Sequence, residues 1–179
     1  GLSVTPIAGG ALLRCGFQKI EAQVTQEGLW LTSIAGGGTG NRFRVIARAF
    51  GRNETGVEPL PRNGMVQVET ARARFVRPDV MEEYSVSADG VRQDFVVARR
   101  PTGTGKLRIE LDVDGASAEA VDGRARLVVD GSGRRIAYSR LHVVDSLGHA
   151  LDASIDVTSA HRMTVMVEDA EAAYPVRID

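Results

Sequence analysis

Ser146 and His149, with Asp145 or Asp152, bring the three residue types of a nucleophilic triad into one short stretch. In a triad the acid orients the histidine, and the histidine takes the proton of the attacking hydroxyl group. No Gly-x-Ser-x-Gly elbow surrounds Ser146, and side chains this close in one hairpin rarely reach triad geometry. A hydrolase that uses Ser146 and His149 is therefore the third of three functional hypotheses.

Acidic residues alternate in a way that imitates a calcium loop. Glu110, Asp112 and Asp114 place oxygens at positions one, three and five, and Gly115 follows at position six. The twelfth position is Val121, where such a loop needs a glutamate. Because spacing by two also occurs in any strand whose acids face water, we expect no calcium site here.

Other ligand-binding motifs are incomplete. His142, His149 and His161 are scattered, and Cys15 is the only cysteine, whereas a structural zinc site needs four ligands at defined spacing. Gly103-Thr104-Gly105-Lys106 resembles part of a phosphate loop but lacks the first glycine and the Ser or Thr after the lysine. We expect no metal and no cofactor, and we expect Cys15 to be a structural thiol.

Arginines at strand spacing form a candidate binding surface. Arg42, Arg44 and Arg48 share one face of a predicted strand, and we interpret them as a solvated sheet face, with an anionic-ligand face as the alternative. Arg72, Arg74 and Arg77 form a similar set. Trp30 lies on the opposite face from Leu29 and Leu31, and a core position is preferred over an exposed sugar platform.

Carboxylates and aromatic residues outside these motifs are interpreted structurally. Glu82 and Glu83 are adjacent, so they point to opposite faces of a strand and cannot act together as a carboxylate pair. The aromatic side chains expected in the core are Phe43, Phe75, Tyr84 and Phe95.

Composition describes an ordinary globular chain. Its 179 residues include 22 basic and 23 acidic ones, for a net charge of -1, which argues against a dedicated nucleic-acid binder. One cysteine excludes an intrachain disulfide, and no apolar run is long enough to span a membrane. No signal peptide opens the sequence, so we expect any secretion signal to lie upstream or to have been removed.

The elements that would position these residues are strands. From Lys106 to Asp114, charged and branched apolar residues alternate for nine positions, which predicts a half-buried strand. Hairpins are predicted around Asp89-Gly90 and Asp130-Gly131, where glycine permits a positive φ. About 13 short strands and no helix are expected, as an antiparallel β-sandwich or stacked antiparallel sheets.

Some segments are less distinct. Residues 1–17 are interpreted as an arm or a lone strand, and 51–64 as a connection without a regular ladder. Leu141–Asp145 and Ala150–Thr158 are predicted to form a hairpin. We divide the chain into an N-terminal region, 1–64, and a β-sandwich module, 65–179, or treat 1–179 as one domain. The ending at Asp179 suggests a piece excised from a longer polypeptide.

The second part of the chain resembles a known kind of module. The closing Tyr174-Pro175-Val176-Arg177-Ile178-Asp179 and the earlier Asp89-Gly90-Val91-Arg92-Gln93-Asp94-Phe95 are its most specific stretches. Over residues 65–179 the sequence is similar to the β-rich segment that precedes SBBP or FG-GAP (integrin-like β-propeller) repeats in large secreted proteins of planctomycetes, verrucomicrobia and myxobacteria. The 179 residues themselves contain no such repeats.

The resemblance implies a non-catalytic module of an extracellular or cell-surface protein, with no catalytic residues to transfer. We expect its partner to be the downstream repeats or a neighbouring chain, bound through an edge strand. The alternative is an adhesin domain that binds a glycan or an anionic polymer on the face with Arg42, Arg44 and Arg48.

Overall fold

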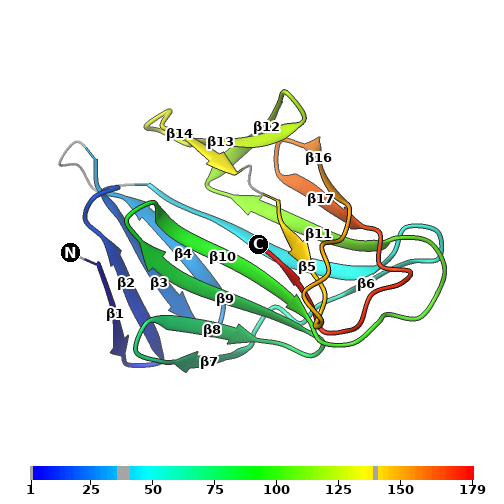
Figure 1. Cartoon of the computed structure of the whole chain (residues 1–179). Coiled ribbons are helices and arrows are strands. Elements are labelled where there is room, and N and C mark those ends of the chain that lie inside the picture. The colour runs from blue at the N-terminus through cyan, green and yellow to red at the C-terminus, as the bar shows by residue number, and fades with distance from the viewer. Residues whose placement is uncertain (1, 36–40, 139–140) are drawn as a thin grey trace.

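The computed structural model describes residues 2–35, 41–138 and 141–179 (Figure 1). It contains 18 strands in three antiparallel sheets, and no helix occurs within these ranges. No helical segment of the described chain could therefore cross a bilayer. The predicted all-β class with stacked antiparallel sheets is confirmed. The strands outnumber the predicted 13, and some of the additional ones lie in residues 2–15 and 56–59, for which the sequence predicts an arm or lone strand and a connection without a ladder.

The large sheet has nine strands and takes them from both sides of residue 64. Its order is β1-β2-β3-β4-β5-β11-β17-β16, and β6 also pairs with β5. The strands are β1 (Leu2–Ile7), β2 (Gly10–Cys15), β3 (Ile20–Thr25), β4 (Gly28–Ser33), β5 (Arg42–Arg52), β6 (Gly56–Pro59), β11 (Leu107–Asp114), β16 (Ala153–Ser159) and β17 (Arg162–Val167).

Two smaller sheets accompany it. The second sheet has the order β15-β18-β10-β9-β8-β7, and the third has the order β12-β13-β14 and lies above β11 and β17 in Figure 1. Their strands are β7 (Met65–Val68), β8 (Arg72–Val76), β9 (Val80–Ser87), β10 (Gly90–Val97), β12 (Ala116–Val121), β13 (Arg124–Val129), β14 (Arg135–Tyr138), β15 (Val143–Val144) and β18 (Val176–Ile178).

β11 is the strand on which the core is built. Its residues alternate between buried and half-buried along the whole element, as the sequence predicts. Leu107, Ile109, Leu111 and Val113 are almost completely buried. They form one cluster with apolar side chains from all three sheets, so the face of β11 that carries them is covered by both smaller sheets. A second cluster joins β2, β3 and β4 to Phe75 and Tyr84 of the second sheet. The predicted core aromatics are thus confirmed.

The N-terminal segments are more regular than expected. Residues 2–15 form a β1–β2 hairpin instead of an arm or a lone strand, because Gly9 adopts a φ of 76° in the turn. The segment 51–64 contains an unpredicted ladder, in which β5 continues to Arg52 and pairs with β6. Pro59 is tolerated there because β6 is short and has only one partner strand.

The predicted hairpin of Leu141–Asp145 and Ala150–Thr158 forms only next to its turn. There, a bridge joins Val144 to Ala150, and backbone hydrogen bonds join Leu151 to Val143 and Asp145 to His149. The strands themselves have other partners: β15 pairs with β18, and β16 pairs with β17. Alternation correctly indicates a strand at 153–159, but its partner is the strand that follows it in the chain and not the one that precedes it.

Removal of the Leu111 side chain tests the central position of β11. We expect Leu111→Ala to lower the free energy of unfolding by about 3 kcal/mol, because the substitution leaves a cavity in a fully buried site. Urea denaturation followed by circular dichroism measures the change. Leu147→Ala is the matched control, because Leu147 is 71% exposed and its loss should change stability little. Equal effects of the two substitutions would contradict this assignment of the core.

Candidate functional site

The residues of the predicted triad form a turn. The Asp145 carboxylate accepts hydrogen bonds from the backbone N–H groups of Leu147 (3.0 Å), His149 (2.9 Å) and Ala173 (3.1 Å). His149 Nδ1 also lies 3.2 Å from this carboxylate. The Ala173 N–H bond, followed by the other backbone donors, lowers the pKa of Asp145 to about 2.

The nucleophile of the triad is not in place. Ser146 contributes its backbone N–H to the Ala173 carbonyl, and its hydroxyl group forms no hydrogen bond with His149 within the described chain. Asp145 and His149 therefore come together, as two of the predicted residues, without the third. Their geometry fits a carboxylate that fixes the 145–149 turn against the strand leading into β18.

Removing the Ser146 hydroxyl group tests the hydrolase hypothesis. We expect Ser146→Ala to hydrolyse p-nitrophenyl acetate at the same rate as the unchanged protein, because no described base contacts that hydroxyl group. Absorbance of released nitrophenolate measures the rate. His149→Ala serves as the comparison for any background reaction of the imidazole. A loss of turnover in both variants would support the hypothesis of a catalytic triad.

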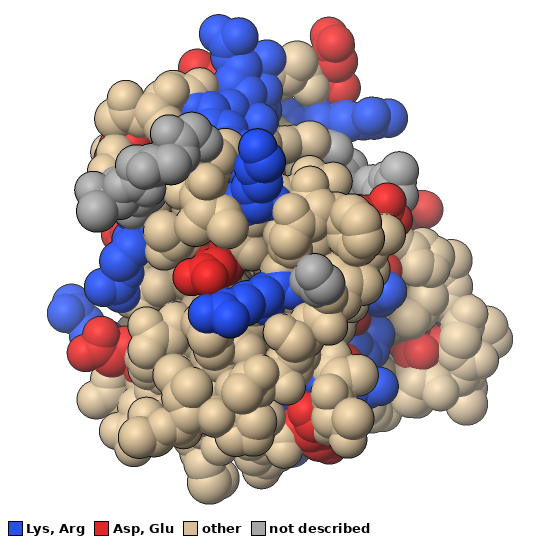
Figure 2. Space-filling view, turned by 90° about the vertical axis from the view of Figure 1, so that its left-hand side faces the viewer, with Lys and Arg blue, Asp and Glu red and all other residues tan. Residues whose placement is uncertain are grey.

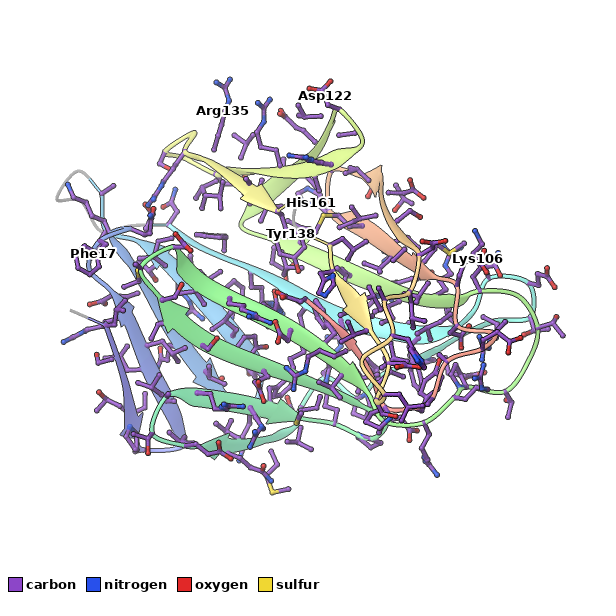
Figure 3. The ribbon with its side chains drawn as sticks, viewed as in Figure 1. Phe17, Lys106, Asp122, Arg135, Tyr138 and His161 are labelled. Carbon is purple, nitrogen blue, oxygen red and sulfur yellow. The ribbon has the colours of Figure 1, made fainter. Side chains whose placement is uncertain are left out.

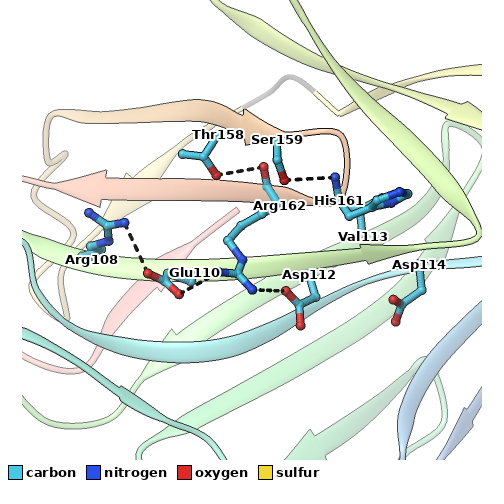
Figure 4. A pocket seen from close by; sticks show the side chains of 9 residues that line it. All are labelled: Arg108, Glu110, Asp112, Val113, Asp114, Thr158, Ser159, His161 and Arg162. Carbon is cyan, nitrogen blue, oxygen red and sulfur yellow. Dashed lines mark hydrogen bonds and ion pairs between the residues drawn. The ribbon is translucent and has the colours of Figure 1, made fainter.

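The acidic residues that imitate a calcium loop are paired with arginines. On the outer face of β11, Asp114 lies 2.7 Å from Arg44, and Asp112 lies 3.3 Å from Arg48. Arg162 of β17 also reaches Asp112, at 3.4 Å (Figure 4). Asp112, Asp114 and Arg162 border an open groove of about 520 Å³. Within the described residues, no three metal-ligating side chains converge.

The predicted anionic-ligand face coincides with this charged ladder. Arg48 is bound to Asp112 and Glu110, and Arg44 to Asp114, so both already have carboxylate partners. The guanidinium groups of Arg42 and Arg44 stack on Trp30, 4.4 and 4.3 Å from its ring centre. Trp30 is thus half-buried beneath cations on the polar face and not inserted in a core layer. Ligand binding by this face stays a prediction.

The second arginine set is divided between two faces. Arg74 and Arg72 contact Glu83 on the outer face of the second sheet. Arg77 was predicted on the same face, but it follows the end of β8 and turns inward, where it is 5% exposed. It forms a 2.6 Å ion pair with Glu82. Glu82 and Glu83 do point to opposite faces, as predicted.

Glu82 is the centre of a buried polar network between two sheets. Its carboxylate accepts hydrogen bonds from Arg77, from Gln93 Nε2 (2.8 Å) and from the Tyr84 hydroxyl group (3.2 Å). It also accepts the backbone N–H of Ala47 in β5. Burial outweighs the attraction of Arg77 and raises the pKa of Glu82 to about 7.

This network replaces part of a strand ladder. β4 pairs with β5 only at Phe43 and Arg42, so the next residues of β5 have no strand on that side until β6 begins to pair at Ala49. Gln93 Nε2 donates to the Val45 carbonyl (2.9 Å), and Glu82 accepts from Ala47 in that gap. Side chains of the second sheet thus satisfy backbone groups of the first.

The raised pKa predicts how stability depends on pH. A carboxyl group with a folded-state pKa near 7, above its value of about 4.5 in the unfolded chain, binds its proton more tightly in the folded state. Its stabilising contribution is complete below pH 4.5 and is lost as the pH rises through 7. We therefore expect the free energy of unfolding to fall between pH 5 and pH 8.

Glu82→Gln provides the test. The amide cannot ionise, so we expect this variant to show a smaller change in the free energy of unfolding over the same pH range, measured by urea denaturation at each pH. Glu119→Gln is a control on the exposed Glu119–Arg126 pair and should retain the unchanged protein's pH dependence. If the free energy of unfolding of Glu82→Gln still depends steeply on pH, the pH dependence comes from another titrating group.

A cleft of about 960 Å³ opens between the second and third sheets. Its floor is apolar and comes from the large sheet, with Phe43, Val45, Leu111, Ile155 and Val165. One wall is β10 and the other is β14. Within the described chain, the only side-chain hydrogen bond between these walls joins the Tyr138 hydroxyl group to Gln93 Oε1 at 3.2 Å. Figure 3 labels Tyr138 beneath the strands of the third sheet. A large, mainly apolar cavity with a few polar groups is typical of a binding site.

The end of the molecule where β1 and β7 lie is a second candidate surface. β1 is the last strand of the large sheet and β7 the last strand of the second sheet, and neither contains a charged residue. Leu2 is 44% exposed and Met65 is 60% exposed. The lower part of this side is largely uncharged, while basic residues gather at the top (Figure 2).

Neither surface was identified from the sequence. The cleft is formed by residues from β3 to β18, so no local motif marks it. The uncharged β1 could have been noticed, because Leu2–Ile7 lacks both acidic and basic residues, but its position at a sheet edge depends on the strand order.

Comparisons with known proteins add no identification. Protein families, curated proteins and solved structures were compared with this chain, and none matches it.

Proposed function

We propose that this protein is a non-catalytic interaction module that pairs an open sheet edge with a strand of a neighbouring segment or chain. The observation that carries the proposal is β1, an edge strand of six uncharged residues, most of which are exposed. An edge strand presents unpaired backbone N–H and C=O groups, which bind another extended segment, and every residue of β1 except Pro6 has an N–H group.

Differences among the sheet edges support β1 as the pairing site. Charged side chains on an edge strand discourage added strands. The opposite edge of the large sheet, β16, carries Asp156, and the β14 edge carries Arg135. β1 and β7 carry no charge and lie at the same end of the molecule.

The pairing of acidic side chains away from the sheet edges supports a binding role without catalysis. The acidic side chains of β11 are paired with arginines, and Asp145 is occupied by backbone donors. The resemblance of residues 65–179 to a module that precedes β-propeller repeats would place the protein outside the cell or on its surface, beside such repeats or another chain.

A charged residue in β1 tests edge pairing. The probe is a library of random twelve-residue peptides displayed on phage and selected on the immobilised protein. We expect the recovered peptides to favour β-branched residues and to bind Thr5→Lys several-fold more weakly, because the added charge opposes strand addition. Peptide affinity is measured by fluorescence anisotropy.

The matched control is Thr102→Lys, the same substitution at an exposed loop position away from the sheet edges. It should bind the peptides as the unchanged protein does. Peptides that bind Thr5→Lys at full strength would contradict the assignment of β1 as the pairing edge.

A further inference from the structure

The cleft between the second and third sheets is bordered by strand edges. Alternate residues of a strand point to opposite faces, so a wall formed by one face contributes every second residue. Here the consecutive residues Asp89 to Gln93 line one wall, and the consecutive residues Ile136 to Tyr138 line the other. Because consecutive residues line each wall, it is the backbone edge of each strand that faces the cleft.

Both edges lack a partner strand over this part of the described chain. β18 pairs with β10 only from Phe95 to Val97, so Gly90 to Asp94 have β9 on one side and no paired strand on the other. β14 is the last strand of the third sheet and pairs only with β13. The two open edges face each other across the cleft.

The hydrogen bonds of β18 determine which groups of β10 point into the cleft. Asp179 exchanges both backbone hydrogen bonds with His142, so its N–H and C=O point toward β15. Because these directions alternate along an antiparallel strand, Ile178 bonds toward β10, opposite Phe95. Gln93 and Val91 lie two and four residues before Phe95 in β10, so their backbone N–H and C=O groups point to the same side as those of Phe95, into the cleft.

The same register sets the position and direction of an added strand. Ile178 lies opposite Phe95, so a segment in line with β18 and directed like it would run antiparallel to β10, past Gln93, Arg92 and Val91. On its other side it would pass Leu141 and β14, which also line the cleft. An added strand would therefore extend the existing β10–β18 ladder.

The walls also specify the side chains of such a segment. Directly opposed residues of paired strands share a face. Gln93 and Val91 share the inward face with Phe95, above the apolar floor, whereas Arg92 lies outward beside Asp94 and Asp179. Residues opposite Gln93 and Val91 must therefore be apolar, and the residue between them must be polar.

We propose that this cleft is an acceptor slot for one extended peptide segment of a partner polypeptide, bound antiparallel to β10 in line with β18, with apolar side chains at every second position. The inference rests on the proposed function as an edge-pairing module but assigns a different edge from β1. The partner segment would join the second sheet to the third through its backbone.

The test uses two blocked hexapeptides of the same composition. One alternates valine and threonine, and the other has three valines followed by three threonines. Fluorescence anisotropy with labelled peptides measures affinity for the unchanged protein. We expect the alternating peptide to bind about tenfold more tightly, because only this order turns all its apolar side chains to the floor while its backbone bonds to β10.

Two variants examine the slot itself. Val91→Pro removes one N–H that faces the cleft without removing a bond to β9, and Ile136→Trp fills the cleft from the β14 wall. Each should weaken binding of the alternating peptide about tenfold while thermal unfolding stays cooperative. Ile34→Trp, outside the cleft, is the control for the added indole ring and should bind normally.

Thr5→Lys separates this inference from the proposed function. The slot predicts that Thr5→Lys binds the alternating peptide as well as the unchanged protein does. If Thr5→Lys loses this binding while Val91→Pro and Ile136→Trp retain it, the slot is wrong and pairing at β1 stands. If all three variants bind equally well, or the two peptides bind equally, the slot is also wrong.

Discussion

The hydrogen bonds between Glu82, Gln93 and the backbone of β5 are the interaction on which the arrangement of the sheets depends. β4 separates from β5 after two residue pairs, and a buried backbone without partners costs several kilocalories per mole. Glu82 and Gln93 supply those partners from the facing sheet. The large sheet can therefore bend between β4 and β5, and the second sheet is held at one position along it.

The three sheets use polar side chains in two ways. On the outer faces, arginines neutralise the carboxylates of neighbouring strands, as in the ladder of β5, β11 and β17. Inside, a few charged groups bridge elements that have no ladder between them, as Arg52 does with Asp169 at 2.6 Å. The open strand edges present backbone N–H and C=O groups to a partner, and the proposed function concerns these edges.

Alternation in the sequence predicts the strands well and their partners poorly. Lys106–Asp114 shows a clear period of two, and β11 follows it residue by residue. Neither the pairing of β15 with β18 nor the cleft beside β10 has a local signal, because both arise from contacts between distant segments. Arg77 shows a grouping error: a period of two places it on the face of Ala73 and Phe75, opposite Arg72 and Arg74, and it is buried on that face.

The partners of β11 also bear on how the chain reaches its folded state. Leu107 lies beside Arg52 on one side and Val167 on the other, so the central ladder joins segments more than fifty residues away in both directions. Closing such long loops must precede most of the stabilising contacts. During synthesis, β5 and β11 emerge well before β17, so one edge of β11 stays unpaired until the last strands of the large sheet have been made.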